Sequence, residues 1–236
     1  MFLYNGYYGA VRVDWTYILL IIATFLSLFA SLKVKTTYSK YSKVAAKCGL
    51  TAEMAVDRVL KANGVYGVGI GRVSGDLTDN FNPKTNTISL SDSVYGKSSI
   101  AAIGVACHEA GHAVQHAKAY GPAKLRLSMV PAMSFSSKFS VFILILGFAL
   151  GFMGLIWVGI ALFSVTTAFQ LVTLPTEFDA SRRALRALEG QGIMTDDELK
   201  GAKKVLSATA MTYVAALAVS LLTLLRYIAI ANRRRN

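Results

Sequence analysis

Residues 139–175 read FSVFILILGFALGFMGLIWVGIALFSVTTAFQLVTLP, and none of these 37 residues is charged. A helix needs about 20 apolar residues to cross a hydrocarbon core of about 30 Å, so this run is too long for one span and fits two short ones. A bend around 151–156 is indicated by the glycines of the run, Gly147, Gly151, Gly154 and Gly159. We therefore predict a transmembrane hairpin over residues 139–175.

Two further apolar runs lie outside the hairpin. Trp15 to Leu32 is free of charge, follows no clear cleavage site and is expected to be a retained anchor. Thr209 to Leu225 is followed by Arg226 and a basic tail. Only 16% of the chain is charged, against roughly 25% in soluble domains. The composition predicts a mainly α membrane protein with about four transmembrane helices, together with a small α+β domain.

The formal charge is +12, and many of the basic residues lie just outside the apolar runs. Of the 25 basic residues, 20 lie in residues 33–138 and 176–208, so these regions are predicted to be cytoplasmic with both ends of the chain outside. The arginines at 233–235 argue against this arrangement, and the last run could instead lie along the membrane interface. No nucleic-acid recognition motif accompanies the charge, so nucleic-acid binding is not expected.

The polar segments contain patterns of both helix and strand. The predicted helices cover 51–62, 98–119, 177–188 and 195–207, the last of which is able to continue into the final apolar run. The predicted strands cover 65–73 and 85–91, with turn residues at 79–84 between them. The predicted division is a lead (1–14), a transmembrane helix (15–32), a catalytic domain (33–138), the hairpin (139–175), a second helical part of that domain (176–208), a transmembrane or interfacial helix (209–231) and a tail (232–236).

The residues just before the hairpin carry a metal-binding pattern. His108-Glu109-Ala110-Gly111-His112 matches H-E-x-x-H, and on a helix the two histidines share one face. Such a pair can bind one zinc ion, with Glu109 placed to take a proton from a zinc-bound water as the general base. The chain has only three histidines, all within nine residues, so a chance match is less plausible. Its two cysteines form no C-x-x-C pair.

A catalytic zinc usually has a third protein ligand. His116 lies eight residues after His108, about 12 Å farther along a helix, so it is expected in the wall of the site rather than on the metal. Glu177 and Asp179 directly follow the hairpin, and two crossings return the chain to the same membrane face. Pro175 and Thr176 are expected to start and cap a helix there, with Glu177 facing inward as the third ligand.

These residues also carry a resemblance to a known family. The chain is similar to the YugP-type membrane zinc metallopeptidases in H-E-A-G-H, in L-P-T-E-F-D-A-S-R-R-A (174–184) and in L-T-D-N-F-N-P-K-T-N-T-I-S-L-S (77–91). More distantly it resembles the HtpX and CAAX-processing gluzincins. The resemblance implies a zincin-like domain that binds one Zn²⁺ per chain through His108, His112 and Glu177, with Glu109 catalytic. Where those relatives have an aspartate that orients a ligating histidine, this chain has Ser181, so Ser181 or Asp179 is expected to replace it.

The expected function is a zinc endopeptidase in a bacterial-type cell membrane that cleaves membrane-associated or unfolded polypeptides. The substrate is expected to add as a strand beside Thr85–Ser91, and Tyr213, Arg182 or Tyr95 could stabilise the oxyanion. A catalytically silent adaptor is a second hypothesis, which the intact Glu109 disfavours. A channel or transporter is a third, disfavoured because the hairpin has no ionisable residue. The sequence leaves the cleavage specificity and the oligomeric state open.

Overall fold

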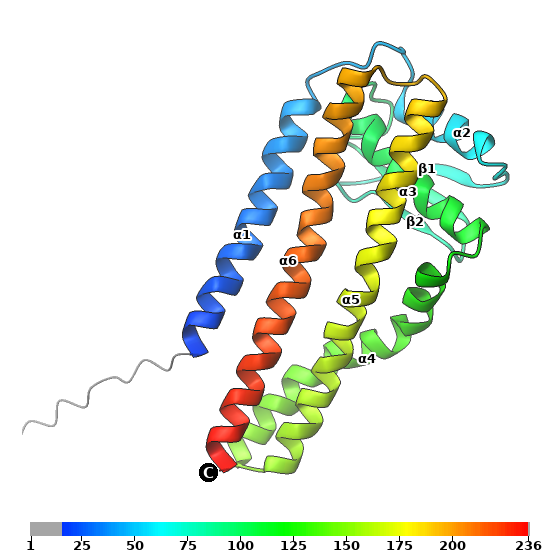
Figure 1. Ribbon diagram of the computed structural model, residues 1–236. Helices are drawn as coiled ribbons and strands as arrows, with labels where there is room; N and C mark the ends of the chain where they lie inside the picture. The colour runs from blue at the N-terminus through cyan, green and yellow to red at the C-terminus, as the bar shows by residue number, and fades with distance from the viewer. Residues whose placement is uncertain (1–15, 236) are drawn as a thin grey trace, which may run out of the picture.

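The computed structural model describes residues 16–235, with side chains for residues 16–233. Figure 1 shows α1, α5 and α6 as long helices side by side, with the sheet, α2 and α3 gathered at one end, called the sheet end below. The elements are, in chain order, α1 (Thr16–Tyr41), α2 (Ala52–Ala62), β1 (Gly69–Val73), β2 (Asn80–Asn82), β3 (Thr87–Ser91), α3 (Ile100–Ala117), α4 (Gly121–Leu150), α5 (Met153–Gly190) and α6 (Asp196–Arg235).

Four of the helices, α1, α4, α5 and α6, are long and apolar enough to cross a membrane. They expose large apolar side chains such as Phe25 and Ile145, which are 67% and 64% accessible in the isolated chain. A helix satisfies its own backbone hydrogen bonds, so lipid can cover such a surface at little cost. The predicted fold class, a mainly α membrane protein with about four spanning helices and a small sheet, is confirmed.

The hairpin bends where the glycines indicated. α4 ends at Gly151, whose φ of 64° is left-handed, and α5 begins two residues later. A Cβ atom on Gly147 would lie 2.8 Å from the backbone nitrogen of Ile156, and one on Gly159 would lie 2.6 Å from the Leu144 side chain. Because both positions lack a Cβ atom, α4 and α5 can pack in close contact across the turn.

The prediction that Pro175 starts a new helix is wrong. α5 runs without a break from Met153 to Gly190, with Pro175 inside it. Pro175 removes one hydrogen bond from the helix, which costs about 3 kcal/mol in an exposed helix. Packing of α5 against α3, α4 and α6 on several sides keeps the helix continuous. Thr176 is therefore an interior helical residue rather than a helix cap. Its buried hydroxyl has no hydrogen-bond partner among the described residues.

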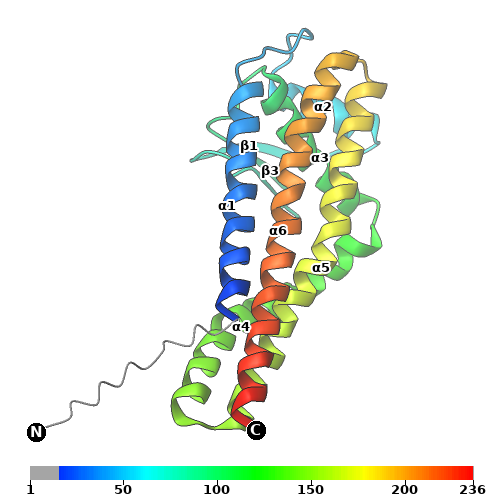
Figure 2. The ribbon, with the colours of Figure 1, turned by 60° about the vertical axis from the view of Figure 1, so that its left-hand side comes forward.

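α6 joins the predicted helix at 195–207 to the last apolar run in one helix, Asp196–Arg235. α6 packs along both α1 and α5, so it lies within the bundle. Figures 1 and 2 place the end of α6 beside the hairpin turn, at the end away from the sheet, while the start of α1 points toward that end but stops short of it.

The sheet has the order β1-β3-β2, with β1 parallel and β2 antiparallel to β3. β3 is therefore central, and its backbone pairs with a strand on each side. This corrects the expectation that Thr85–Ser91 receives a substrate strand, since neither side of β3 is open. The edge strand facing α3 is β2, which lies within 79–84, the stretch where turn residues were predicted between the two strands. Its three residues pair with Thr87–Ser89.

One hydrophobic core holds the polar domain together. α3 lies in its centre, between α2, the sheet and the sheet-end halves of α5 and α6. Ser99 caps α3 by accepting a hydrogen bond from the Ala102 backbone nitrogen at 3.2 Å. Thr51 occupies the cap position of α2, as predicted, but its side chain makes no cap bond. The central position of α3 fixes the H-E-x-x-H residues relative to the membrane helices.

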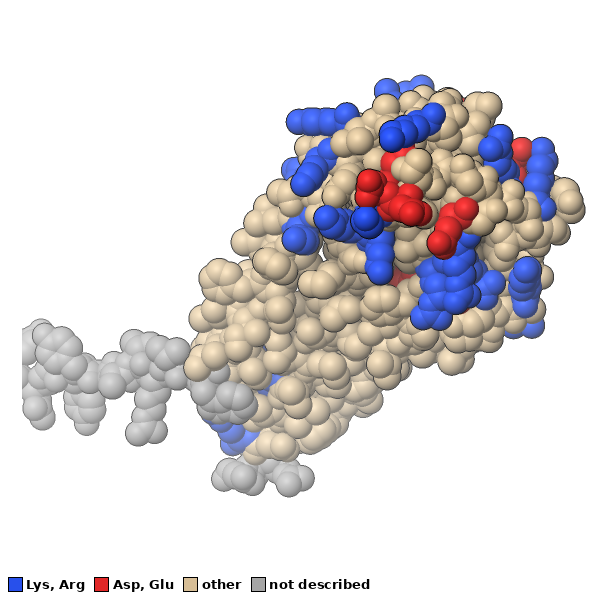
Figure 3. Space-filling model, turned by 45° about the horizontal axis from the view of Figure 1, so that its top comes forward, with Lys and Arg blue, Asp and Glu red and all other residues tan. Residues whose placement is uncertain are grey.

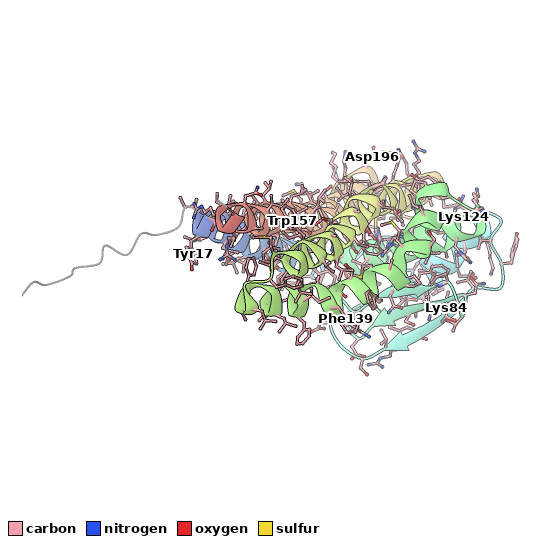
Figure 4. All side chains as sticks on the ribbon, turned by 90° about the horizontal axis from the view of Figure 1, so that it is seen from below. Tyr17, Lys84, Lys124, Phe139, Trp157 and Asp196 are labelled. Carbon is pink, nitrogen blue, oxygen red and sulfur yellow. The ribbon has the colours of Figure 1, made fainter. Side chains whose placement is uncertain are left out.

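Charged side chains are concentrated at the sheet end. Figure 3 shows lysine and arginine side chains around this end and an almost uncharged surface over much of the bundle beyond it. In Figure 4, Lys84 and Lys124 lie on the side of the sheet, while Tyr17, at the start of α1, lies at the opposite end. This division marks the boundary between the polar domain and the membrane-facing surface.

Candidate metal centre

The H-E-x-x-H residues occupy the middle of α3, where the helix is almost completely buried. His108 and His112 are one turn apart, and their rings meet edge to face with centroids 4.7 Å apart. Glu109 lies beside them with 8% of its surface exposed. The helix therefore presents two imidazoles and one carboxylate toward the same interior space.

Glu177 reaches the two histidines from α5. Its Oε2 atom lies 3.2 Å from Nε2 of His108 and 3.5 Å from Nε2 of His112. The three ligand atoms lie within 4.8 Å of one another. A tetrahedral zinc with bonds of 2.0–2.1 Å would separate its ligands by roughly 3.3–3.4 Å, which the two distances from Glu177 to the histidines match. Glu177 is only 1% exposed, so its charge depends on neighbouring groups inside the protein.

A glycine allows α3 and α5 to come this close. A Cβ atom on Gly111 would lie 2.5 Å from the backbone oxygen of Ala180, closer than any side chain can tolerate. Gly111 therefore lets α3 lie directly against α5 at the level of the three ligand atoms. The spacing of the motif places the glycine next to His112, so the close contact and the ligand set share one turn of the helix.

Each histidine has a partner on its other ring nitrogen. Nδ1 of His108 lies 3.1 Å from Oγ of Ser181, and Nδ1 of His112 lies 3.0 Å from Oε1 of Gln115. With the proton on Nδ1, each imidazole donates to its oxygen partner and leaves Nε2 free to bind a metal. Of the two replacements considered for the aspartate of the relatives, Ser181 is the one that contacts His108.

Asp179 contacts Gln115, which in turn contacts His112. Gln115 donates from Nε2 to the Thr176 carbonyl and to Asp179 Oδ2, both at 2.8 Å. Asp179 also accepts a hydrogen bond from Arg183 Nε at 2.6 Å. The sequence prediction missed Gln115, although it lies three residues after His112 on the same helical face.

Arg126 is a second residue that the sequence prediction missed. It comes from α4, and its Nη1 atom lies 3.1 Å from Oε1 of Glu177. That oxygen is buried and makes no hydrogen bond of good geometry within the described residues. Glu177 thus directs one oxygen to the histidines and the other to a cation. Arg126 lies outside the H-E-x-x-H motif and outside the segment 174–184, so no sequence pattern pointed to it.

A cleft of about 250 Å³ opens beside the site. It lies between β2, α3, α4 and α5, and Glu109, His112, Glu177 and Arg126 line it together. Pro131 lies inside α4, which bends in Figure 1, and a proline is a common cause of such a bend. The bend lets the first turns of α4 form one wall of the cleft.

Some of the other candidate residues lie at the cleft and some lie elsewhere on the surface. His116 lines the cleft with its ring 5.9 Å from that of Phe81, and it is not among the three grouped ligands. Tyr213 lines the cleft together with Glu109 and Glu177. Arg182 and Tyr95 line other grooves of the surface. Of the three residues considered for the oxyanion, only Tyr213 is placed at the site.

Asp79 links the cleft to the sheet. Its carboxylate accepts hydrogen bonds from the Ser91 backbone nitrogen at 2.8 Å and from the Ser91 hydroxyl at 2.9 Å. Burial raises the pKa of Asp79, and the two bonds from Ser91 oppose that rise. Asp79 precedes β2 directly, so these bonds hold the start of the edge strand against β3 beside the site.

Comparison with known proteins assigns the chain to a family. The family model described as "putative neutral zinc metallopeptidase" matches residues 16–232. The chain belongs to this family. A relative from Bacillus subtilis (strain 168), described as "putative membrane protease YugP", is 45% identical over 212 residues, which cover 90% of this chain and 94% of that protein. No solved structure matches the chain.

Membership in the zinc metallopeptidase family confirms the resemblance seen in the sequence. The match includes α3 and α5, and therefore all three grouped ligands. The relative's description as a membrane protease agrees with the four apolar helices. This chain is thus a membrane protein of a zinc peptidase family, with a group of His and Glu residues that could hold a metal ion.

Proposed function

We propose that this protein is a membrane-embedded zinc endopeptidase in which His108, His112 and Glu177 hold one Zn²⁺ ion and Glu109 is the general base. The observation that carries the proposal is the grouping of the three ligand atoms within 4.8 Å, in a cleft that Glu109 also lines. The hydrogen bonds on Nδ1 of both histidines support it, because they turn both Nε2 atoms toward the shared site.

Each residue has a distinct task in peptide hydrolysis. When bound, zinc supplies a Lewis acid that polarises a carbonyl and makes water more acidic. The Glu109 carboxylate takes the proton of the attacking water and delivers it to the leaving nitrogen. Tyr213 and Arg126 line the same cleft and are proposed as donors to the negative charge that forms on the carbonyl oxygen.

The substrate is proposed to be an extended polypeptide that lies along β2. Asn80, Phe81 and Pro83 line the cleft from the edge of the sheet. An extended segment could hydrogen-bond to the backbone of this edge and pass beside Glu109. Only unfolded or loosely folded chains can offer such a segment, which favours membrane-associated or unfolded polypeptides as substrates.

We place the catalytic end on the cytoplasmic side of a bacterial-type cell membrane. The regions 33–138 and 176–208, which carry 20 of the 25 basic residues, meet at the sheet end. Basic residues near spanning helices favour the cytoplasmic face. The continuous α6 then puts the arginine tail on the opposite side.

The proposal is tested by casein cleavage with the purified protein in detergent. Glu109→Gln is expected to reduce cleavage by at least 10³-fold, because the general base is lost. Glu189→Gln, at the far end of α5, is the matched control and should keep wild-type activity. The zinc content of all three proteins is measured in parallel. Equal cleavage by wild type and Glu109→Gln at equal zinc content would contradict the mechanism.

A further inference from the structure

A groove between α1 and α6 is lined by five lysines. One face of α1 contributes Lys33 and Lys40, and one face of α6 contributes the others. Spacings of three, four and seven residues place side chains on one face of a helix. The hydroxyls of Thr36, Thr37 and Ser207 also line the groove, whose volume is about 690 Å³. This surface, called the lysine groove below, is defined by Lys33, Lys40, Lys200, Lys203 and Lys204.

The positive charge of the lysine groove is mostly unpaired. Among the residues that the structure describes, no carboxylate lines it. Lys200 forms an ion pair with Asp197 at 2.9 Å, and Lys40 lies over the Tyr41 ring at 5.7 Å. Within residues 16–235, Lys33, Lys203 and Lys204 have no carboxylate oxygen within 4.0 Å. α1 and α6 pack against each other, so these like charges face one another across a helix contact and favour a bound anion.

The groove lies at the boundary between the charged and apolar surfaces. Leu32 directly precedes Lys33, and α1 exposes Phe25, Phe29 and Leu32 by 67%, 58% and 52% below it. On α6, Met211 lines the end of the groove and Val214 is exposed one turn farther on. Lysines just beyond an apolar helical surface lie at the level of lipid headgroups.

We propose that the lysine groove binds the phosphate of an anionic phospholipid, with its acyl chains along the apolar surfaces of α1 and α6. The groove supplies ammonium and hydroxyl donors and no carboxylate, which matches a phosphodiester. The apolar surface continuous with it favours a lipid over a soluble anion. Lysines whose only role is to flank a transmembrane helix need not gather in one groove. Lys35 on α1, for example, does not line the lysine groove.

The test measures binding of fluorescent phosphatidylglycerol to the purified full-length protein in a neutral detergent. One lysine contributes about fivefold in affinity for an anionic lipid, so the combined Lys33→Gln, Lys203→Gln and Lys204→Gln variant should bind on the order of 100-fold more weakly. The control combines Lys35→Gln, Lys43→Gln and Lys138→Gln, which remove the same charge outside the groove. The control should stay within about threefold of wild type.

Three outcomes would overturn the proposal. The first is an equal loss of affinity in the control, which would indicate a diffuse charge effect. The second is unchanged affinity in the groove variant. The third is competition by inorganic phosphate as strong as that by unlabelled phosphatidylglycerol, which would indicate a soluble anion. Phosphatidylcholine should compete poorly. The Lys203→Arg variant keeps the charge and should keep wild-type affinity, which separates loss of charge from misfolding. The measurement is independent of peptidase activity.

Discussion

α5 makes two close helix contacts that both depend on glycine but have different roles. Near the hairpin turn, Gly147 and Gly159 bring α4 against α5, and the neighbouring side chains are the apolar Leu144 and Ile156. At the sheet end, Gly111 brings α3 against α5, and the neighbouring side chains are the proposed ligands. The first contact involves only apolar side chains, whereas the second also sets the distance between the proposed metal ligands.

The largest effect is expected from removing a ligand at the second contact. His108→Ala, His112→Ala and Glu177→Ala should each lower bound zinc from about one ion per chain to almost none, with loss of casein cleavage. His116→Ala should keep its zinc, since His116 lies in the wall of the cleft. The measurement is metal analysis of the purified proteins. Full retention of zinc in Glu177→Ala would refute its role as the third ligand.

Gly111→Ala compares the two contacts directly. The added Cβ atom would lie 2.5 Å from the Ala180 oxygen, so α3 and α5 must move apart. We expect a loss of about 1–3 kcal/mol in stability and weaker zinc binding. Gly147→Ala should cost similar stability but leave zinc affinity unchanged, because it separates only α4 and α5.

Gly104→Ala is the control for this comparison, since its Cβ atom would make an ordinary contact of 3.6 Å with Ala202. It should not lower stability, because alanine favours a helix more than glycine does. Thermal unfolding of the three variants measures their stability, and zinc titration measures their zinc affinity. Equal weakening of zinc binding by Gly111→Ala and Gly147→Ala would remove the distinction between the two contacts.

The partners of the imidazoles are expected to have an intermediate effect. Ser181→Ala and Gln115→Ala each remove the oxygen that holds one Nδ1–H, so zinc affinity should fall about 10–100-fold. Ser181→Asp should keep or increase affinity, because a carboxylate can accept the same hydrogen bond from His108. The measurement is competition with a zinc chelator. Wild-type affinity in both alanine variants would show that the hydrogen bonds do not orient the ligands.

Arg126 is expected to have the smallest effect of this series. Arg126→Gln removes the cation 3.1 Å from Glu177 Oε1, and we expect cleavage to slow about tenfold. Arg126→Lys should restore part of the rate, because it keeps the charge but not the planar guanidinium. Steady-state kinetics at matched zinc content separate a change in kcat from a change in KM. A Lys variant as slow as the Gln variant would assign the role to shape rather than to charge.

The sequence allowed the spans and the ligand candidates to be predicted because both depend on local patterns. The uncharged run at 139–175 sets the hairpin, and the four-residue spacing of His108 and His112 sets their shared face. Glu177 was predicted from its place directly after the second crossing. The structure brings these three ligand candidates together, as the sequence reasoning proposed.

The errors arose where contacts distant in the sequence decide the outcome. Whether β3 is central or at an edge depends on pairing with β1 and β2, which the alternation of 85–91 does not reveal. The helical state of Pro175 depends on packing of α5 between other helices, which outweighs the local preference. Arg126 approaches Glu177 from a different helix, and no spacing rule connects the two residues.

The ligand set also implies an order of events during synthesis. Glu177 is 69 residues beyond His108, and the transmembrane hairpin lies between them. A ribosome completes α3 well before α5, and α5 reaches the sheet end only after both helices of the hairpin have entered the bilayer. The proposed three-ligand site therefore cannot form before the sheet-end half of α5 has been synthesised. Under the proposed mechanism, the protein would gain peptidase activity only once the sheet-end half of α5 is in place.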